Sequence, residues 1–331
     1  MRWLRLLLSL VAAVLLAATI FSFLGDAIDI AELMANFRPQ LVVAAVAMVA
    51  AGLLAWSRWT LVLAILALLA NAWPLVPYYY PAAEASGRQP DVTVLVVNLQ
   101  GRTSSAQAMV EVARQRRPDL LVVTEIAAGS EAALKPLEAD YPFRAAELRK
   151  SPYNVLLLSR HRILAYQFVY PTAGYLPVLD ARLCATQALV TAETNGPPCY
   201  SLVALHAARP LGEGNLALRN RQLNAAAGIA ARDRQRPVLL AGDLNVTPWS
   251  SAFGRMERMA GLTDASVGAG IQPTWFSRFP FLGLPIDHVL NNPGFEVVGV
   301  EVLPSIGADH FPLLVSLAFS PKTAPAAGST Q

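Results

Sequence analysis

The sequence predicts an α/β protein: two mixed β-sheets packed between helices, a four-layer α-β-β-α sandwich, preceded by transmembrane helices. Three observations support this fold class. The first 80 residues are strongly apolar, the remainder alternates strand-like runs with helical stretches, and polar residues stand at the ends of several runs. About 230 residues in the second part are ample for two packed sheets.

Residues 1–80 form the predicted membrane region. It contains three apolar runs, Trp3–Leu24, Leu41–Trp56 and Trp59–Val76. The first is long enough to cross a hydrocarbon layer of about 30 Å, whereas the second is short for a span. The alternatives are a cleaved signal peptide for the first run and buried soluble helices for the others. The additional runs and the lack of a small-residue cleavage site favour uncleaved anchors.

The charges around these runs predict an orientation. Arg2 and Arg5 precede the first run, the loop 25–40 is mostly acidic, and Arg58 lies between the second and third runs. Positive residues favour the cytoplasmic side, so the amino terminus is expected inside. Three spans would then place the second part outside the inner membrane of a bacterial cell, and loss of the second span would reverse this orientation.

The second part begins after a linker at 81–90, extends over 91–320, and is followed by a tail at 321–331 that is predicted to be disordered. The apolar periodicity and the capping residues predict helices at 104–117, 130–138, 215–235 and 250–260. The strand-like runs lie at 92–98, 120–124, 154–158, 163–170, 184–193, 200–206, 238–241, 286–290, 295–302 and 313–319.

Three polar clusters stand at the ends of predicted strands: Gly242-Asp243-Leu244-Asn245, Pro285-Ile286-Asp287-His288 and Gly307-Ala308-Asp309-His310. The chain has four histidines, and two of them directly follow one of these aspartates, while His206 ends another run. Gly-Asp-Leu-Asn alone would fit a turn or a helix cap. Three such clusters at strand ends instead indicate one polar site, because buried carboxylates need a partner.

This set of side chains suits phosphate-ester hydrolysis. Magnesium prefers carboxylate oxygens, water and substrate phosphate as ligands. A carboxylate can position or deprotonate a water, and an imidazole can offset phosphoryl charge or protonate a leaving group. A neutral amide can bind phosphate without adding negative charge.

These residues resemble the endonuclease/exonuclease/phosphatase superfamily, of the deoxyribonuclease and sphingomyelinase type. The resemblance extends from Asp91 to Phe319 and rests on Asn98, Glu125, Leu205-His206, the Gly-Asp-Leu-Asn motif, Asp287 and Asp309-His310. The motifs around Arg219–Leu223, Thr247–Ser250 and Pro273–Trp275 are similar to a bacterial subgroup with membrane helices at the amino terminus. Ala308 and Thr124 replace residues that are more often serine and glutamine, respectively.

The resemblance implies a role for each residue. Metal binding falls to Asn98, Glu125 and Asp309, with Mg²⁺ as the ion and Mn²⁺ as the alternative. The catalytic residues it implies are His206, Asp243, Asn245, Asp287 and His310. Asp243 would activate water, Asn245 would bind phosphoryl oxygens, and Asp287 would fix the ring of His310. His288 is expected on the opposite strand face, and His161 on the surface.

Charge and cysteines limit the function further. Residues 91–320 hold 20 Lys and Arg against 19 Asp and Glu, a net charge of +1. Nucleic-acid-binding domains usually show a basic excess, which is missing here. Cys184 and Cys199 flank a predicted hairpin that turns near 194–197. Unless this hairpin bulges, that register separates their α-carbons beyond about 7 Å, which favours free thiols but leaves the pairing open.

The sequence therefore predicts a membrane-anchored hydrolase of phosphate esters that depends on a divalent metal. Nucleic acids, phospholipids and sugar phosphates all remain candidate substrates, because one core can serve each of them. A phospholipid or sphingomyelin-type phosphodiesterase is the alternative to a nuclease, and a catalytically silent membrane scaffold is the alternative to an enzyme. The lipid bilayer is the expected partner, and no obligate protein partner is evident.

Overall fold

The computed structural model describes residues 2–80, 87–149, 152–171, 176–185, 198–212 and 214–320. The tail 321–331, most of the predicted linker and the predicted hairpin turn at 194–197 lie outside these ranges. The chain divides into two compact units. One comprises Met1–Tyr80 with Val246–Gly254, and the other comprises Pro81–Asn245 with Arg255–Gln331.

The first unit is helical. Its main helices are α1 (Arg2–Phe21), α2 (Asp29–Ala35), α3 (Arg38–Leu54) and α4 (Arg58–Ala72), followed by the short α5 (Val76–Tyr79). Two helical stretches, Arg2–Leu24 and Arg58–Tyr79, are long and apolar enough to cross a membrane. The pair α2 and α3, bent by 71°, would make a third span if both helices belong to one crossing. The predicted second run, Leu41–Trp56, falls mostly within α3 of this pair.

The segment Val246–Gly254 packs within this helical unit. The Oδ1 atom of Asn36 accepts hydrogen bonds from Thr247, from the backbone N at 3.0 Å and from Oγ1 at 2.9 Å. The indole N–H of Trp249 donates to the carbonyl of Asn36 at 3.1 Å, and Glu32 accepts two bonds from Ser251. Trp249 also meets the ring of Tyr78 edge-on. Polar side chains of the α2 region therefore hold the segment that directly follows Asn245.

The second unit has the predicted fold: two mixed six-stranded sheets flanked by helices, which confirms the fold class. The first sheet has the order β11-β12-β1-β2-β4-β3 and the second β5-β6-β7-β8-β10-β9. The strands are β1 Val92–Asn98, β2 Leu120–Thr124, β3 Phe143–Glu147, β4 Val155–Ser159, β5 Arg162–Val169, β6 Val178–Cys184, β7 Cys199–His206, β8 Val238–Asp243, β9 Thr263–Asp264, β10 Asp287–Asn291, β11 Phe295–Val302 and β12 Leu313–Phe319.

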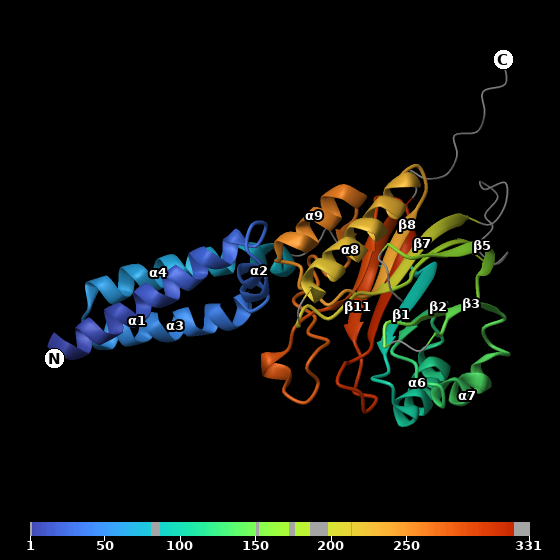
Figure 1. Ribbon diagram of the computed structural model, residues 1–331, viewed down its shortest axis with the longest axis horizontal. Coiled ribbons are helices and arrows are strands. Elements are labelled where there is room, and N and C mark those ends of the chain that lie inside the picture. The colour runs from blue at the N-terminus through green and yellow to red at the C-terminus, as the bar shows by residue number, and fades with distance from the viewer. Residues whose placement is uncertain are drawn as a thin grey trace, which may run out of the picture. The chain divides into compact units, whose positions relative to one another are not determined.

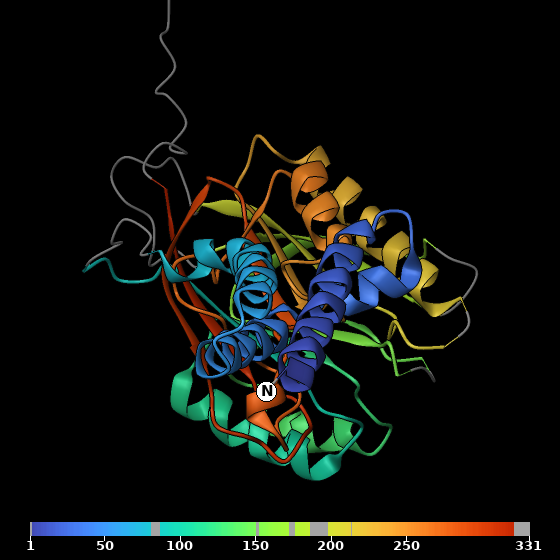
Figure 2. The same cartoon turned by 90° about the vertical axis from the view of Figure 1, so that its left-hand side faces the viewer.

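Apolar side chains on the inner faces of both sheets form one continuous core, which includes Val94, Leu157, Leu202 and Val289. A second cluster lies between the outer face of the first sheet and the helices α6 (Thr103–Arg116) and α7 (Ser130–Leu134). Helix α8 (Asn215–Arg232) contacts β7 and β8 of the other sheet, and α9 spans Ser251–Ala260. Figures 1 and 2 show α6 and α7 on one side of the strands and α8 on the other.

The structure differs from the sequence predictions in this unit. Strands β3 and β6 were not predicted, and the strand expected at 184–193 lies mostly outside the described residues. Cys184 and Cys199 are direct partners in the β6–β7 ladder, with α-carbons 3.9 Å apart, and form a disulfide. The prediction of free thiols assumed a tight turn, but β6 ends at Cys184, so the whole connection lies between the paired cysteines.

His161 was predicted to lie on the surface, but it is buried. Its Nδ1 atom lies 2.7 Å from the hydroxyl of Tyr200, and its Nε2 lies 3.8 Å from Asp119. Burial lowers the pKa of this imidazole, although Asp119 acts in the opposite direction. The residue therefore belongs to a polar cluster in the interior.

Candidate active site

Strand order brings most of the predicted residues to one end of the two sheets. Asn98 ends β1 and Glu125 directly follows β2, and these strands are parallel neighbours. His206 and Asp243 end the parallel strands β7 and β8 and pair in register. Asp287 begins β10, which is antiparallel to β8, and stands opposite Asp243. Because parallel strands end at the same sheet edge, five polar residues from distant segments meet there.

The backbone at two of these strand ends is unusual. Gly242 has φ of +141°, and a Cβ on it would lie 1.9 Å from the carbonyl oxygen of Leu205 on the neighbouring strand. Only glycine permits this close approach just before Asp243. Glu125 has φ of +50°, in the left-handed region that non-glycine residues seldom adopt. Some contact must therefore hold Glu125 in place.

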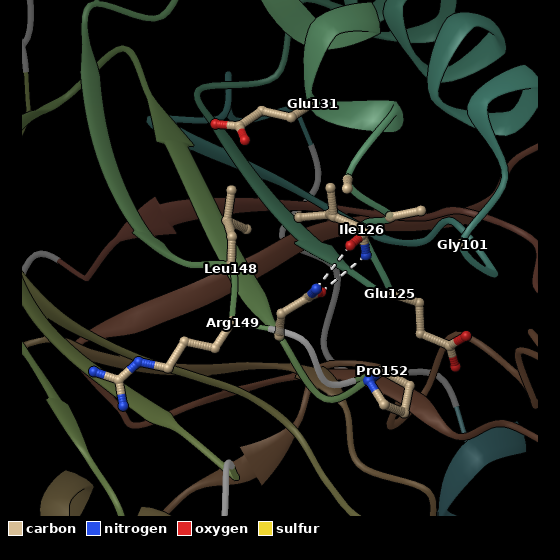
Figure 3. A pocket seen from close by; sticks show the side chains of 10 residues that line it. Gly101, Glu125, Ile126, Glu131, Leu148, Arg149 and Pro152 are labelled. Carbon is tan, nitrogen blue, oxygen red and sulfur yellow. Dashed lines mark hydrogen bonds between the residues drawn. The ribbon is translucent and has the colours of Figure 1, made fainter.

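Two contacts do so: the backbone N of Gly101 donates to the carbonyl of Glu125 at 2.8 Å, and the buried Asn154 bonds the next residue. Its Oδ1 atom accepts from the backbone N of Ile126 at 2.8 Å, and its Nδ2 donates to the carbonyl of Ile126 at 2.7 Å. The two dashed lines in Figure 3 mark this pair beside Glu125. The Asn154 amide therefore restrains the backbone of the residue that follows Glu125, and so helps to hold Glu125 at its left-handed position.

Asn98 connects the two sheets. Its Nδ2 atom lies 3.1 Å from Oε1 of Glu125 and 2.9 Å from Oδ2 of Asp243. Its Oδ1 accepts from the backbone N of Gln100 at 2.8 Å. The side chain therefore turns N–H groups toward the carboxylates while its oxygen is engaged elsewhere, a geometry that suits an orienting residue better than a direct metal ligand.

His206 lies between two carboxylates and is fully buried. Its Nδ1 atom is 2.8 Å from the carbonyl oxygen of Pro152, which can only accept, so Nδ1 carries a proton. Its Nε2 lies 3.4 Å from Oδ2 of Asp243 and 3.8 Å from Oε1 of Glu125. The ring of Tyr153 packs against the imidazole with centroids 5.0 Å apart.

Asp287 and His310 form a buried pair. The Nδ1 atom of His310 lies 2.7 Å from Oδ2 of Asp287, and its Nε2 lies 3.8 Å from Oδ2 of Asp243. Burial by itself disfavours the cation, but Asp287 and then Asp243 outweigh it and raise the pKa of His310 to about 9. The imidazole is therefore protonated at neutral pH and presents a cation to the end of the sheets.

The carboxylates respond differently to burial. Burial raises the pKa of Asp243, and the nearby charge of Asp287 adds to that effect. For Glu125 burial acts in the same direction, but the charge of His206 and hydrogen bonds from Arg209 and Asn98 outweigh it and lower the pKa. The site therefore holds a firmly ionised Glu125 beside a more basic Asp243, a separation that suits different chemical roles.

Asn245 follows Asp243 closely and also has a left-handed backbone, with φ of +50°. Its backbone N donates to Oδ1 of Asp243 at 3.0 Å, and its Nδ2 donates to the carbonyl of Ala207 at 2.9 Å. The Asp243–Asn245 turn is thus closed by its own side chains, next to the loop that follows His206.

Arg209 is a site residue that the sequence did not reveal. Its guanidinium lies 2.7 Å from Oε1 of Glu125, while about half of the side chain remains exposed. The only sequence signal was its position three residues after His206, and an arginine in a loop is ordinary. The result is a cation at the solvent side of the carboxylates.

Asp309 lies apart from the two carboxylate clusters. Its backbone N donates to Oε1 of Gln100 at 3.1 Å, and its charge raises the pKa of both His310 and Arg209. It is therefore near the site, but its carboxylate belongs to neither close group of candidate metal ligands in the described residues. His288 faces away, as expected, and its Nδ1 lies 3.3 Å from Asp264.

A pocket of about 420 Å³ opens beside Glu125. Its wall is largely apolar or backbone and includes Gly101, Ile126 and Leu148. Figure 3 shows the Arg149 guanidinium and the Glu131 carboxylate directed away from Glu125. The carboxylate cluster therefore adjoins a cavity that could hold part of a small molecule.

A divalent metal fits the donor set. Two groups of buried side chains place one ligand atom each within 4.8 Å of one another: Glu125, His206 and Asp243, and Asp243, Asp287 and His310. Buried Nε2 of His206 and Oδ1 of Asp287 have no hydrogen-bond partner among the residues described. Carboxylate oxygens are the ligands that magnesium prefers, so Glu125 and Asp243 suit such an ion.

Comparison with known proteins agrees with this geometry. The model of the Endonuclease/Exonuclease/phosphatase family matches residues 95–316, which include all the site residues described above. No curated protein matches the chain.

Several solved structures share the fold. An endonuclease/exonuclease/phosphatase from Bacteroides vulgatus is 17% identical, with a TM-score of 0.59, and the match covers 70% of this chain and 100% of that one. A humanized TDP2 from D. rerio is 16% identical, with a TM-score of 0.56 over 68% of this chain and 98% of the other. D. rerio TDP2 complexed with single strand DNA product is 14% identical, with a TM-score of 0.57, and the match covers 68% of this chain and 98% of that one.

Proposed function

Because the chain belongs to the endonuclease/exonuclease/phosphatase family, whose members generally hydrolyse phosphoester bonds, we propose that it is a membrane-anchored phosphoesterase dependent on a divalent metal. The observation that carries this proposal is the buried cluster at the sheet ends. Asp243 lies within 4 Å of both His206 and His310, and Asn98 joins it to Glu125. Burying several charged groups together is costly unless they are paired with one another or coordinate a metal.

Glu125 would hold the metal, with Mg²⁺ preferred and Mn²⁺ as the alternative, while Asn98 orients the carboxylates of Glu125 and Asp243. Asp309 remains a further contributor in this proposal. When bound, the ion would offset negative charge on the phosphoryl group.

The other residues transfer protons and stabilise negative charge. Asp243 has a raised pKa, which makes it a better proton acceptor, so it positions a water and takes its proton. Protonated His310, held by Asp287, and His206 stabilise negative charge on the phosphoryl oxygens. Asn245 uses one amide proton on Ala207 and directs the other to phosphate.

Arg209 adds a role that the sequence did not suggest. Its half-exposed guanidinium reaches Glu125 from the solvent side, where a substrate phosphate would enter. Arginine binds phosphate through a planar fork of N–H groups, so Arg209 serves as a substrate-binding cation.

We place this catalytic unit outside the inner membrane of a bacterial cell, on a multi-pass anchor. The Cys184–Cys199 disulfide supports an oxidising compartment. Reporter fusions at Ser86 test the orientation: activity of a reporter that works only in the cytoplasm would overturn it.

Two substrate classes remain distinct. The balanced charge of the unit and the apolar anchor favour a phospholipid-type phosphoester. A nuclease is the second candidate, because the similar D. rerio TDP2 was solved with a DNA product.

The decisive experiment measures turnover by the full-length protein in lipid nanodiscs, with Mg²⁺, with Mn²⁺ and with chelator. The panel contains single-stranded DNA, phospholipids and sugar phosphates. Hydrolysis of at least one class, abolished by chelator, is expected. Inactivity toward every phosphoester under all metals would refute the proposal.

Glu125→Gln then tests the metal assignment. The variant should require more Mg²⁺ for half-maximal activity, and part of the lost rate should return at high Mg²⁺. The matched control is Glu111→Gln, which removes an exposed carboxylate on α6. A variant whose Mg²⁺ dependence equals that of the control would show that Glu125 does not hold the ion.

A further inference from the structure

A loop beside the candidate site exposes several large apolar side chains. This aromatic loop, residues 276–282, carries Phe279, Phe281 and Leu282, whose exposed fractions are 46%, 79% and 49%. Arg278, directly before Phe279, and Pro280 are exposed as well. Soluble surfaces rarely keep adjacent apolar side chains in water, and such patches mark sites of contact with proteins or membranes.

The aromatic rings form a continuous row. Trp275 contacts Phe276 with ring centroids 5.2 Å apart, Phe276 contacts Phe279 at 5.6 Å, and Phe279 contacts Phe281 at 6.1 Å. Each ring supports the next, so the exposed tip has a defined shape.

The base of the loop is bonded to the strand ends that carry the site. Ser277 donates from its backbone N to the carbonyl of Asp309 at 2.9 Å and from Oγ to that of Ala308 at 2.8 Å. Trp275 forms a β-bridge with His310. Thr274 Oγ1 accepts from the backbone N of Asp287 at 3.2 Å. A surface that contacts the tip therefore lies next to Asp309 and the Asp287–His310 pair.

The rest of the chain indicates that the apolar partner of this loop is a lipid bilayer. It carries two helices, or three if the bent pair is one span, that are apolar enough to cross a bilayer.

The composition of the tip fits the same partner. Aromatic rings and arginine are typical of the region between lipid headgroups and hydrocarbon, where rings bury their apolar faces and guanidinium meets phosphate. A second copy of the chain is the alternative partner, and the test below distinguishes it from a bilayer.

We propose that the aromatic loop docks on the lipid bilayer surface and presents the site to a phosphoester carried by a membrane lipid. The substrate part of this statement rests on the proposed phosphoesterase function, whereas docking does not. The loop thereby selects substrates that reside in the membrane, and the polar cluster at the sheet ends hydrolyses them.

Docking is measured on the full-length protein in nanodiscs. A fluorophore is attached to Phe281→Cys, and quenching by lipids with a spin label in the acyl chain is recorded. The matched control is Tyr166→Cys on β5, which is also more than half exposed. Strong quenching at 281 and little at 166 is expected. Equal weak quenching, or crosslinking of position 281 to a second copy, would overturn the proposal.

The substrate part is measured separately with Phe279→Ser/Phe281→Ser. Hydrolysis of a phospholipid in the bilayer should fall roughly tenfold or more, the loss that about 1.4 kcal/mol of surface affinity gives. Hydrolysis of a soluble aryl phosphodiester should be unchanged, and Phe281→Trp should retain the bilayer rate. Equal losses on both substrates would refute a docking role. If no phosphoester is cleaved by the unaltered protein, the lipid-substrate proposal falls with the function, and quenching alone decides docking.

Discussion

Replacing Asn154 by alanine tests how the metal-binding glutamate is aimed. The side chain pairs with both the N–H and the carbonyl of Ile126, at 2.8 and 2.7 Å, and it is buried. Alanine would leave both backbone groups without that partner. The left-handed backbone of Glu125 would lose one of its restraints, while the bond from the backbone N of Gly101 to the carbonyl of Glu125, at 2.8 Å, would remain.

The magnitude follows from the two groups exposed by the change. A buried donor or acceptor left unpaired costs about 1–3 kcal/mol. Ile126 and Asn154 both line the pocket of about 420 Å³, so water can reach the freed groups and hold the cost near the lower end. We expect a loss of about 2–3 kcal/mol in the free energy of unfolding of the catalytic unit.

The assay has two readouts on full-length protein in nanodiscs. Hydrogen exchange of the β2 amides reports stability, and calorimetric titration reports Mg²⁺ affinity without substrate. If the Glu125 side chain is no longer held in its present orientation, the affinity for Mg²⁺ should fall roughly tenfold.

A matched control separates aiming from stability. Asn292 is also a buried asparagine that pairs with backbone groups, accepting from Val238 N and donating to the Arg236 carbonyl, away from the site. Asn292→Ala should lower stability comparably and leave Mg²⁺ affinity intact. Equal Mg²⁺ affinities in the two variants would refute the positioning role of Asn154.

Two further predictions concern protonation and coupling. Asp287→Asn should reduce turnover less than His310→Gln, because Asp287 acts through the ring of His310. For the same reason the double variant should be little slower than His310→Gln alone. Steady-state rates in which the two losses add would contradict this. Burial raises the pKa of Glu257 from 4.5 to about 7, so the folded protein binds a proton that the unfolded chain releases. Stability should therefore decline as pH rises from about 4.5 to about 7, and thermal unfolding of Glu257→Gln should show a flatter profile; an unchanged profile would exclude Glu257 as the source.

The sequence was sufficient to predict the fold class and the residues that meet at the sheet ends. The reason is physical: polar residues that directly follow buried parallel strands must emerge at one edge. Asp243 was therefore identifiable from its position after a buried strand, whereas the roles of Glu125 and of the Asp287–His310 pair came from the resemblance to the family.

What the sequence could not supply depended on long loops and on backbone conformation. The Cys184–Cys199 pair required the register of β6 and β7, which the connecting segment does not encode in a simple turn motif. Arg209 acts through a loop that bends back to Glu125. Asn154 looked like the first residue of a strand, and only the coordinates show its bonds to Ile126.

The hydrogen bonds that join Asn36 and Glu32 to residues 247–251 determine whether the catalytic part can be separated from its helices. The Bacteroides vulgatus structure and the humanized D. rerio TDP2 are matched over almost their full length by about two thirds of this chain. Here, however, the stretch immediately after Asn245 is built into the helical unit, so the boundary between the units is discontinuous along the chain. Cutting at residue 80 would strip Thr247 and Trp249 of their partners one turn beyond the Gly-Asp-Leu-Asn motif. An exchange of anchors between such enzymes would therefore have to transplant the 246–254 segment together with its helices.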